Sequence, residues 1–168
     1  MRLRDGYADL VGEGLDAAIR VGELRDSSLV ARRFDWQHLV MVASPGYLAA
    51  HGHPRHIDDL RAHAAIVFRM PSSGRDRTWQ LMGPQGLLEW LPRVQVQVND
   101  GEGMVAAAVA GLGITQVPDN MVPGELHSGA LVELLPECRP PAMPISIVMP
   151  SARLMPPRVR ALIALLEG

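Results

Sequence analysis

The chain of 168 residues has a single cysteine, Cys138, so no disulfide can form within it. Aromatic residues make up only 4% of the sequence, and no apolar run approaches the ~20 residues of a membrane-spanning helix. Positive charge is not in excess, because the formal net charge is −2. This balance gives no bulk attraction to nucleic acid or to an anionic membrane. The first residues lack the apolar core of a secretory signal, so we expect a globular protein of a reducing compartment.

Motifs of enzyme chemistry are also missing. The nucleophile elbow, the zinc-protease helix and the phosphate-binding P-loop do not occur in the sequence. Cys138 lies among prolines without a neighbouring histidine, so a thiol nucleophile is not predicted. His51, His53, His56 and the nearby His63 have the residue type of a zinc site, but they straddle an expected turn, where solvated histidines are common. The sequence therefore predicts no enzyme, no metal and no cofactor.

The composition that remains is that of a folded domain, with 48% hydrophobic and 20% charged residues. Fourteen prolines and sixteen glycines indicate many short elements. Hydrophobic periodicity and turn signals predict alternating strands and helices, and hence an α/β fold. The expected strands are 15–21, 29–34, 39–43, 64–68, 78–81, 87–91, 94–98, 114–117, 131–134 and 144–149. The expected helices are 7–13, 46–51, 57–61, 104–110 and 122–127, with a last one from 157. Connectors near 34–38 and 136–144 suggest that the chain leaves one lobe and later returns.

The segment 99–118 is the most informative part of the chain. It follows an alternating strand, and Asn99 and Asp100 can both cap the helix after it. Glu102 lies three residues after Asn99, as in a capping box, and Gly111 suits the left-handed position that ends a helix. The N-terminus of such a helix presents unpaired N–H groups and a partial positive charge. The segment is therefore either an anion site or an ordinary strand–helix–strand unit.

The same segment matches the dinucleotide fingerprint G-x-G-x-x-A at Gly101, Gly103 and Ala106, with Asp119 near the place of the ribose-binding acid. Two features count against a nucleotide. The strand before it alternates with glutamine instead of being continuously apolar. Asp100 would also place negative charge beside the pyrophosphate. A nucleotide-dependent oxidoreductase is therefore only a third hypothesis, which a titration with nicotinamide dinucleotides would test.

Two further groups are candidates for binding an anion. The loop 71–75, with Ser72 and Ser73, resembles an anion-binding loop or is a plain exposed turn. Arg20 and Arg69 each end a predicted strand, where they can pair with a ligand carboxylate or serve as surface charges.

A series of short motifs runs in order along nearly the whole chain. The motifs are DLVGEGLDAAIRVG at 9–22, DSSLVARRF at 26–34, ASPGYLAAHG at 43–52, Asp59-Leu60 with His63, NDGE at 99–102, AGLGI at 110–114, VP at 117–118, GALV at 129–132, LP at 135–136, PI at 144–145 and PRVR at 157–160. In their order and spacing they resemble the effector-binding domain of LysR-type transcriptional regulators.

The resemblance implies a two-lobed, type II periplasmic-binding-protein-like fold. Residues 1–34 and 143–168 would form the first lobe and 35–142 the second, with a small and anionic effector between the lobes. The implied ligand-binding residues are Arg20, Val21, Gly22, Arg69, Asn99, Asp100, Gly101, Val117 and Pro118.

The chain also departs from the pattern of a full regulator. It has no winged helix-turn-helix or linker helix, and the first lobe lacks its first strand, first helix and most of its second strand. We therefore expect a fragment with an incomplete first lobe and an exposed apolar edge. The resemblance further implies a cytoplasmic homo-oligomer that contacts DNA only through the missing domain and contacts no membrane. A solute-binding protein for transport has the same fold and is the alternative from another class.

Overall fold

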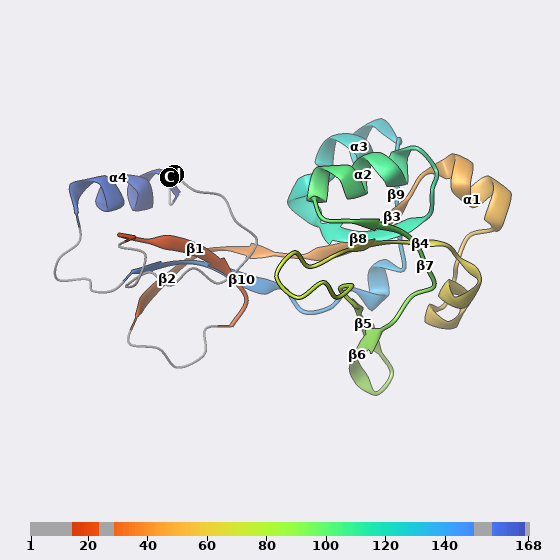
Figure 1. Ribbon diagram of the computed structural model, residues 1–168, viewed down its shortest axis with the longest axis horizontal. Helices are drawn as coiled ribbons and strands as arrows, with labels where there is room; N and C mark the ends of the chain where they lie inside the picture. Colours follow the sequence, from red (N-terminus) through yellow and green to blue (C-terminus); the bar gives the residue numbers. More distant parts are fainter. Residues whose placement is uncertain (1–14, 24–28, 150–155, 167–168) are drawn as a thin grey trace. The chain divides into compact units, whose positions relative to one another are not determined.

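The computed structural model describes residues 15–23, 29–149 and 156–166 of the chain. It divides the chain into two compact units, one of Met1–Gln37 with Ala142–Gly168 (unit 1) and one of His38–Pro141 (unit 2). The sequence placed the corresponding boundaries at 34/35 and 142/143. The helix expected over 7–13 lies outside the described residues. Both units combine a sheet with helices, so the predicted α/β class is confirmed (Figure 1).

Unit 1 contains a three-stranded antiparallel sheet with strand order β1-β10-β2. Its strands are β1 (Ala18–Val21), β2 (Val30–Gln37) and β10 (Met143–Met149), and the helix α4 (Pro157–Leu166) follows. Val159 and Ile163 of α4 pack with Ile147 and Met149 in one buried cluster. The predicted amphipathic helix from residue 157 is therefore confirmed, and its apolar side covers the central strand of this sheet.

Strand β2 is longer than the sequence predicted, and the expected connector over 34–38 is wrong. The strand continues to Gln37, which pairs with Met143 of β10 across a register shift between Ile145 and Ser146. The polar residues after Phe34 suggested a loop. However, β10 provides hydrogen-bonding partners along the whole segment, and this pairing outweighs the local composition.

Unit 2 is built on a five-stranded sheet with strand order β7-β4-β8-β3-β9. Strands β7, β4 and β8 are parallel, and β3 runs antiparallel between β8 and β9. The continuously apolar segment 39–43 forms the fully buried strand β3, as predicted. The bounds are β3 Leu39–Ala43, β4 Ala65–Phe68, β7 Val94–Val98, β8 Ile114–Pro118 and β9 Val132–Leu134.

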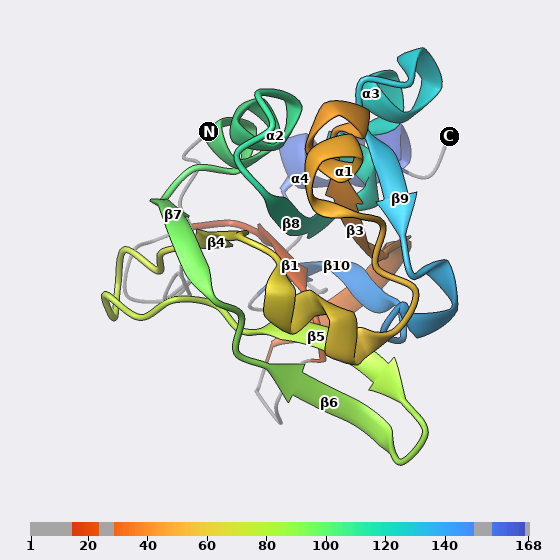
Figure 2. The same cartoon turned by 90° about the vertical axis from the view of Figure 1, so that its right-hand side faces the viewer.

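Each face of this sheet has its own core, because successive side chains of a strand point to opposite faces. Val40 and Val42 of β3 belong to a cluster with α2 (Gly101–Val109), whereas Met41 and Ala43 belong to a second cluster. The second cluster contains residues of α1 (Pro45–His51), of η1 (Ile57–Ala62) and of the hairpin β5 (Trp79–Gly83) and β6 (Gly86–Trp90). Figure 2 shows α2 and α3 (Pro123–Ser128) on the side of the sheet opposite to this hairpin.

Besides the apolar packing, the side chain of Gln116 joins the hairpin to the sheet by hydrogen bonds. The Gln116 carboxamide on β8 accepts a hydrogen bond from the Gln80 N–H at 2.9 Å and donates one to the Gln80 carbonyl at 2.7 Å. The Gln116 carboxamide thus pairs with the backbone N–H and carbonyl of β5 in the way that a neighbouring strand would. The hairpin was predicted from its Gly83-Pro-Gln-Gly86 turn and is confirmed. Its attachment through Gln116 was not predicted.

Helix α2 begins at Gly101, and its N-cap is Asp100, whose carboxylate accepts a hydrogen bond from the Gly103 N–H at 2.7 Å. The predicted capping box of Asn99 and Glu102 is wrong. Because the cap is one residue later than that box requires, the third helical position is Gly103, which has no side chain to complete a box.

The end of α2 was predicted correctly. Gly111 has φ of +79°, in the left-handed region. The Leu112 N–H donates to the Ala107 carbonyl at 3.1 Å, and the Gly111 N–H donates to the Ala108 carbonyl at 3.0 Å. These two bonds form a Schellman motif, which satisfies carbonyls that the helix end leaves unpaired.

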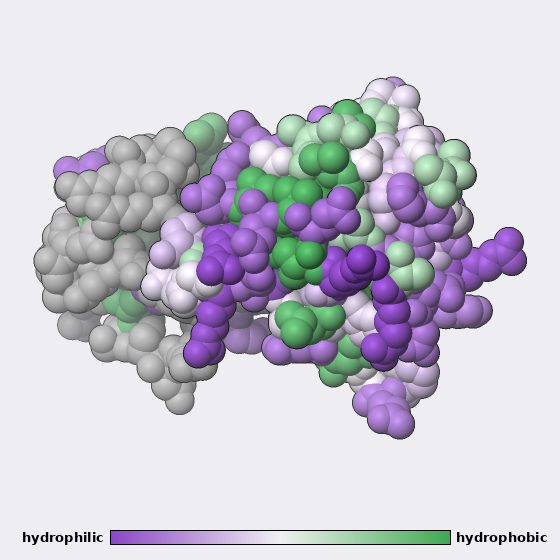
Figure 3. All heavy atoms as spheres, turned by 45° about the vertical axis from the view of Figure 1, so that its right-hand side comes forward, coloured by the Kyte–Doolittle hydropathy of each residue, from purple (hydrophilic) through white to green (hydrophobic). Residues whose placement is uncertain are grey.

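The surface of unit 2 is mixed in polarity. In the view of Figure 3, hydrophobic side chains gather in one area that strongly hydrophilic ones border. Leu87, Leu91, Val109 and Leu112 are the large apolar side chains of unit 2 that are exposed. Within the described residues, no helix has both the length and the apolar character needed to cross a membrane.

Candidate functional site

The carboxyl ends of the parallel strands β7, β4 and β8 meet at one edge of the unit 2 sheet, which we name the carboxyl edge. At this edge, β4 and β7 are followed by residues that the sequence predicted to bind ligand, and β8 ends in two such residues. Helix α2 also begins at this edge, directly after β7 and its cap. Six of the nine predicted residues therefore belong to one part of unit 2: Arg69, Asn99, Asp100, Gly101, Val117 and Pro118.

Arg69 is the cationic side chain of the carboxyl edge. Its backbone N–H donates to the Val98 carbonyl at 2.7 Å, which joins the end of β4 to the end of β7. Its guanidinium Nη1 donates to the Asp76 Oδ1 at 3.1 Å, and the Arg69 side chain is 46% exposed. The Arg69 backbone is thus fixed by a hydrogen bond, one guanidinium nitrogen is held by Asp76, and the side chain as a whole is half-exposed.

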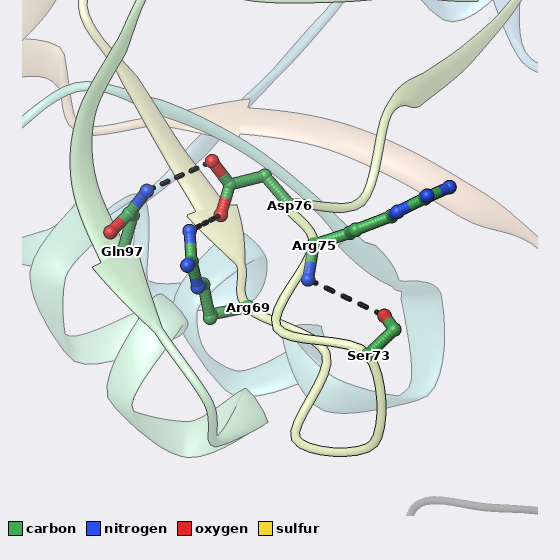
Figure 4. Close-up of polar contacts among 5 residues, drawn as sticks. All are labelled: Arg69, Ser73, Arg75, Asp76 and Gln97. Atoms are coloured by element: carbon green, nitrogen blue, oxygen red, sulfur yellow. Dashed lines mark hydrogen bonds and ion pairs between the residues drawn. The ribbon is translucent and has the colours of Figure 1, made fainter.

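Asp76 also contacts the neighbouring strand. Its second oxygen, Oδ2, accepts a hydrogen bond from the Gln97 Nε2 of β7 at 2.8 Å. Figure 4 shows Arg69 and Gln97 directed to the two oxygens of this one carboxylate. Neither Asp76 nor Gln97 was among the predicted site residues. The only available signal was that Gln97 is a polar residue near the end of a strand that leads to the predicted site.

The loop between Arg69 and Asp76 is a tight turn. Arg69 and Asp76 face each other in an antiparallel bridge, the Met70 N–H donates to the Arg75 carbonyl at 2.8 Å, and Gly74 has φ of +63°. The Ser73 hydroxyl accepts a hydrogen bond from the Arg75 N–H at 3.4 Å. Loop 71–75 was predicted to be either an anion-binding loop or a plain exposed turn. The geometry is that of a turn, because the Ser73 hydroxyl and the Arg75 N–H are paired with each other inside the loop.

The N-terminus of α2 already has a carboxylate beside it. The Asp100 carboxylate that caps the helix carries the negative charge that a helix N-terminus attracts. Gly101 lies under Met121, since a Cβ at position 101 would stand 2.5 Å from the Met121 Cε. Asn99 is exposed. The helix end and the guanidinium of Arg69 are therefore each next to an internal carboxylate.

The last residues of β8, with Asp119 directly after them, form another part of the carboxyl edge. Val117 is 1% exposed and packs in the same core cluster as Val40, so its side chain is on the face of the sheet that α2 covers. Pro118 is opposite Leu39 in the β3–β8 ladder. The nucleotide hypothesis assigned Asp119 to binding a ribose. In the structure its carboxylate accepts hydrogen bonds from the backbone N–H groups of His38 and Asn120.

The remaining three predicted residues are in unit 1, at the end of β1. Arg20 is opposite Ser146 in the ladder with β10, and Val21 is exposed. Gly22 has φ of +97°, and its N–H donates to the Pro144 carbonyl at 2.9 Å. The glycine is thus required by the turn that leaves β1, because a left-handed backbone is unfavourable for other residues.

The histidines of the 51–63 segment form no metal-binding group. In the described residues, no three His, Cys, Asp or Glu side chains are placed to hold a metal ion. His63 is buried, and its Nδ1 is 3.2 Å from the Tyr47 hydroxyl.

An open hollow of about 520 Å³ lies where α1 begins and α2 ends. Small and apolar side chains provide most of its lining, and it lies at the end of α2 opposite to the carboxyl edge.

Comparison with known proteins gives the family of this chain. Residues 2–168 match the family model described as the LysR substrate binding domain. YhjC, an HTH-type transcriptional regulator of Escherichia coli (strain K12), is 31% identical over 164 residues, which cover 98% of this chain and 55% of that protein. The HTH-type transcriptional activator AaeR of the same strain is 33% identical over 156 residues, or 92% of this chain and 50% of that protein.

A solved structure supports the same assignment. The regulatory domain of CrgA, a LysR-type transcriptional regulator from Neisseria meningitidis, has a TM-score of 0.83 and 30% sequence identity, and the match covers 98% of this chain and 79% of that one. This chain therefore belongs to the LysR substrate-binding-domain family, and its fold is the type II periplasmic-binding-protein-like fold. It spans about half the length of the curated relatives that it matches.

Proposed function

We propose that this chain is the ligand-sensing part of a transcriptional regulator and that the carboxyl edge of unit 2 binds part of a small anionic metabolite. The observation that carries the proposal is the convergence of three strand ends, the start of α2 and the half-exposed guanidinium of Arg69. In open α/β sheets, ligands bind outside the carboxyl ends of the parallel strands. The family match supports a sensor, and the relatives named above are transcriptional regulators, which favours this class over transport or nucleotide-dependent catalysis.

The charges of the carboxyl edge support a carboxylate of the ligand at Arg69. A hydrogen bond between a guanidinium and a carboxylate contributes about 1.5–3 kcal/mol when it is sheltered, and the lower end applies to a half-exposed arginine. Asn99 and the first N–H groups of α2 provide neutral donors beside it. Arg20, Val21 and Gly22 are proposed as ligand contacts of unit 1 on the family resemblance alone.

The other properties of the regulator follow from the family. We propose that the complete protein is a homo-oligomer in the cytoplasm, that it binds DNA through a separate domain, and that the ligand changes the arrangement of its subunits. In this scheme the chain itself catalyses no reaction and needs no cofactor.

A screen for ligand-induced stabilisation tests the proposed function. The wild-type chain is heated with each of a set of small organic acids, since a ligand that binds only the folded state raises the melting temperature. Arg69→Ala should weaken binding of any hit about tenfold. Arg55→Ala, which removes an exposed arginine of the same unit outside the carboxyl edge, is the matched control and should leave the affinity unchanged. A hit that binds Arg69→Ala as tightly as the wild type would remove the carboxyl edge from the site.

A further inference from the structure

The contact between Asp76 and Arg69 leaves part of the guanidinium available. A guanidinium has five N–H donors, and its Nε and Nη2 groups lie side by side on one edge. Asp76 binds Nη1, on the other side of the guanidinium. A Cβ built at Gly74 would stand 4.0 Å from Nη2, so the turn backbone passes beside this edge. The Nε and Nη2 pair can bind the two oxygens of one carboxylate in parallel.

Asp76 is held more firmly than a surface carboxylate. Its side chain is 19% exposed, compared with 46% for Arg69. One oxygen accepts from Arg69 and the other from Gln97, and its backbone faces Arg69 in the antiparallel bridge. The Asp76 carboxylate is thus held by Arg69 at the end of β4 and by Gln97 of β7, and its backbone is held by the turn.

The other charged groups of this region do not cancel the charge of Asp76. The Arg75 side chain extends away from the carboxylate in Figure 4. The Arg77 guanidinium lies over the Phe68 ring, 5.4 Å from the ring centroid. Asp100, at the start of α2, adds a second negative charge. Arg69 and the N-terminus of α2 therefore each have one carboxylate beside them, Asp76 and Asp100.

We propose that Asp76 determines which anions the carboxyl edge accepts. It holds Arg69 so that the Nε and Nη2 pair receives a single planar carboxylate, and its fixed charge opposes a second negative charge on the same ligand. The ligand class is therefore a singly charged carboxylate, and dianions such as sulfate or a phosphate monoester are disfavoured. This inference rests on the proposed function, because it describes the selectivity of the same site.

The test compares two small anions of different charge on the intact 168-residue chain. Nitrogen-15 NMR follows the Arg69 Nε–H signal during titration with sodium acetate and with sodium sulfate at constant ionic strength and neutral pH. The measured quantity is the ratio of the two dissociation constants, acetate over sulfate. Asp76→Asn should raise this ratio about tenfold, which is the expected effect of a unit charge several ångströms from the second charge of sulfate.

A matched control separates this effect from the loss of any surface charge. Asp58 also pairs with an arginine, the Nε of Arg61 at 3.4 Å, and is exposed in η1 of the same unit. Asp58→Asn should leave the ratio unchanged. The backbone amide spectrum reports whether each variant is folded, and Asp76→Ser removes the same charge if Asp76→Asn does not fold. A ratio within twofold of the wild type in the Asp76 variants, or an equal change in Asp58→Asn, overturns the inference.

The same titration distinguishes failure of the inference from failure of the proposed function. If neither anion moves the Arg69 signal in the wild-type chain, Arg69 is not an anion-binding residue, and both the proposed site and its selectivity fail. If both anions bind the wild-type chain and the ratio does not depend on Asp76, the selectivity alone fails. A higher ratio in both Asp76 variants, with no change in Asp58→Asn, supports the inference.

Discussion

The Tyr47 hydroxyl is the centre of a buried polar cluster in unit 2, and its removal gives a sharp test of the structure. It accepts a hydrogen bond from the Ala64 N–H at 2.9 Å and lies 3.2 Å from the His63 Nδ1. Among the contacts of this hydroxyl, Nδ1 is the only one that can accept its proton, so we assign the hydroxyl as donor to Nδ1, which places the imidazole proton on Nε2. Tyr47 and His63 are both buried, so water cannot replace these bonds in the folded state.

Tyr47→Phe removes the hydroxyl and leaves two polar groups, the Ala64 N–H and the His63 Nδ1, without this partner. Each buried group that loses its hydrogen bond costs about 1–3 kcal/mol. Because the residue at position 64 is only partly buried, we expect the free energy of unfolding to fall by about 2–4 kcal/mol. The phenyl ring remains, so the stacking on His51, with ring centroids 4.3 Å apart, should not change.

Urea unfolding, followed by circular dichroism, measures this change. Ser128→Ala is the control, because its hydroxyl donates to the Glu125 carbonyl at an exposed site, where such substitutions change stability by less than about 0.5 kcal/mol. The slope of free energy against urea should be the same in all three proteins. If Tyr47→Phe lies within about 0.5 kcal/mol of the wild type, the hydroxyl does not connect Ala64 and His63 as described.

Three further predictions concern the same unit. Burial, followed by the charge of His51, lowers the pKa of His63 from 6.5, so the folded chain resists a proton that the unfolded chain accepts. The free energy of unfolding should therefore fall as the pH drops below about 6.5, and His63→Asn should reduce this dependence in urea titrations at several pH values. Gln116→Glu loses the donor to the β5 carbonyl and should lower stability by about 1–3 kcal/mol, with faster amide exchange in the hairpin than in the wild type. Gly113→Ala should prevent folding or lower the melting temperature strongly, because φ is +154° and the new Cβ would stand 2.5 Å from the Ala64 carbonyl oxygen. The control is Gly46→Ala, where the new Cβ would meet open space, and it should be neutral or stabilising.

The local elements that the sequence predicted are those that short-range chemistry determines. The alternation over 94–98 and the apolar run over 39–43 became β7 and β3, and Gly111 and Gly129 end their helices in the left-handed region. The errors occurred where a distant partner decides the outcome. Strand β2 continues to Gln37 because β10 is beside it. That partner is more than a hundred residues away in the chain, so no local pattern could indicate it.

The candidate site shows the same division. Arg69 and the 99–101 segment could be predicted because they follow recognisable strands, one apolar and one alternating, and the carboxyl ends of parallel strands meet at one edge. Asp76 could not be predicted, since its role depends on the turn that returns it to Arg69 and on Gln97 of a separate strand. The sequence predicted Asp100 both as a cap and as a ligand-binding residue, and the structure shows its carboxylate capping α2.

The internal carboxylates give the carboxyl edge a property that suits a sensor. A cation at an empty site is either hydrated or paired, and pairing with Asp76 keeps Arg69 in one orientation before any ligand arrives. Orientation in advance reduces the entropy that binding costs, while the opposing charges of Asp76 and Asp100 reduce the attraction for an anion. The first effect favours a ligand of the right shape, and the second lowers the affinity for every anion. A site with an oriented cation and opposing charges beside it combines high selectivity with modest affinity. Its occupancy therefore follows the concentration of the ligand instead of saturating at trace amounts.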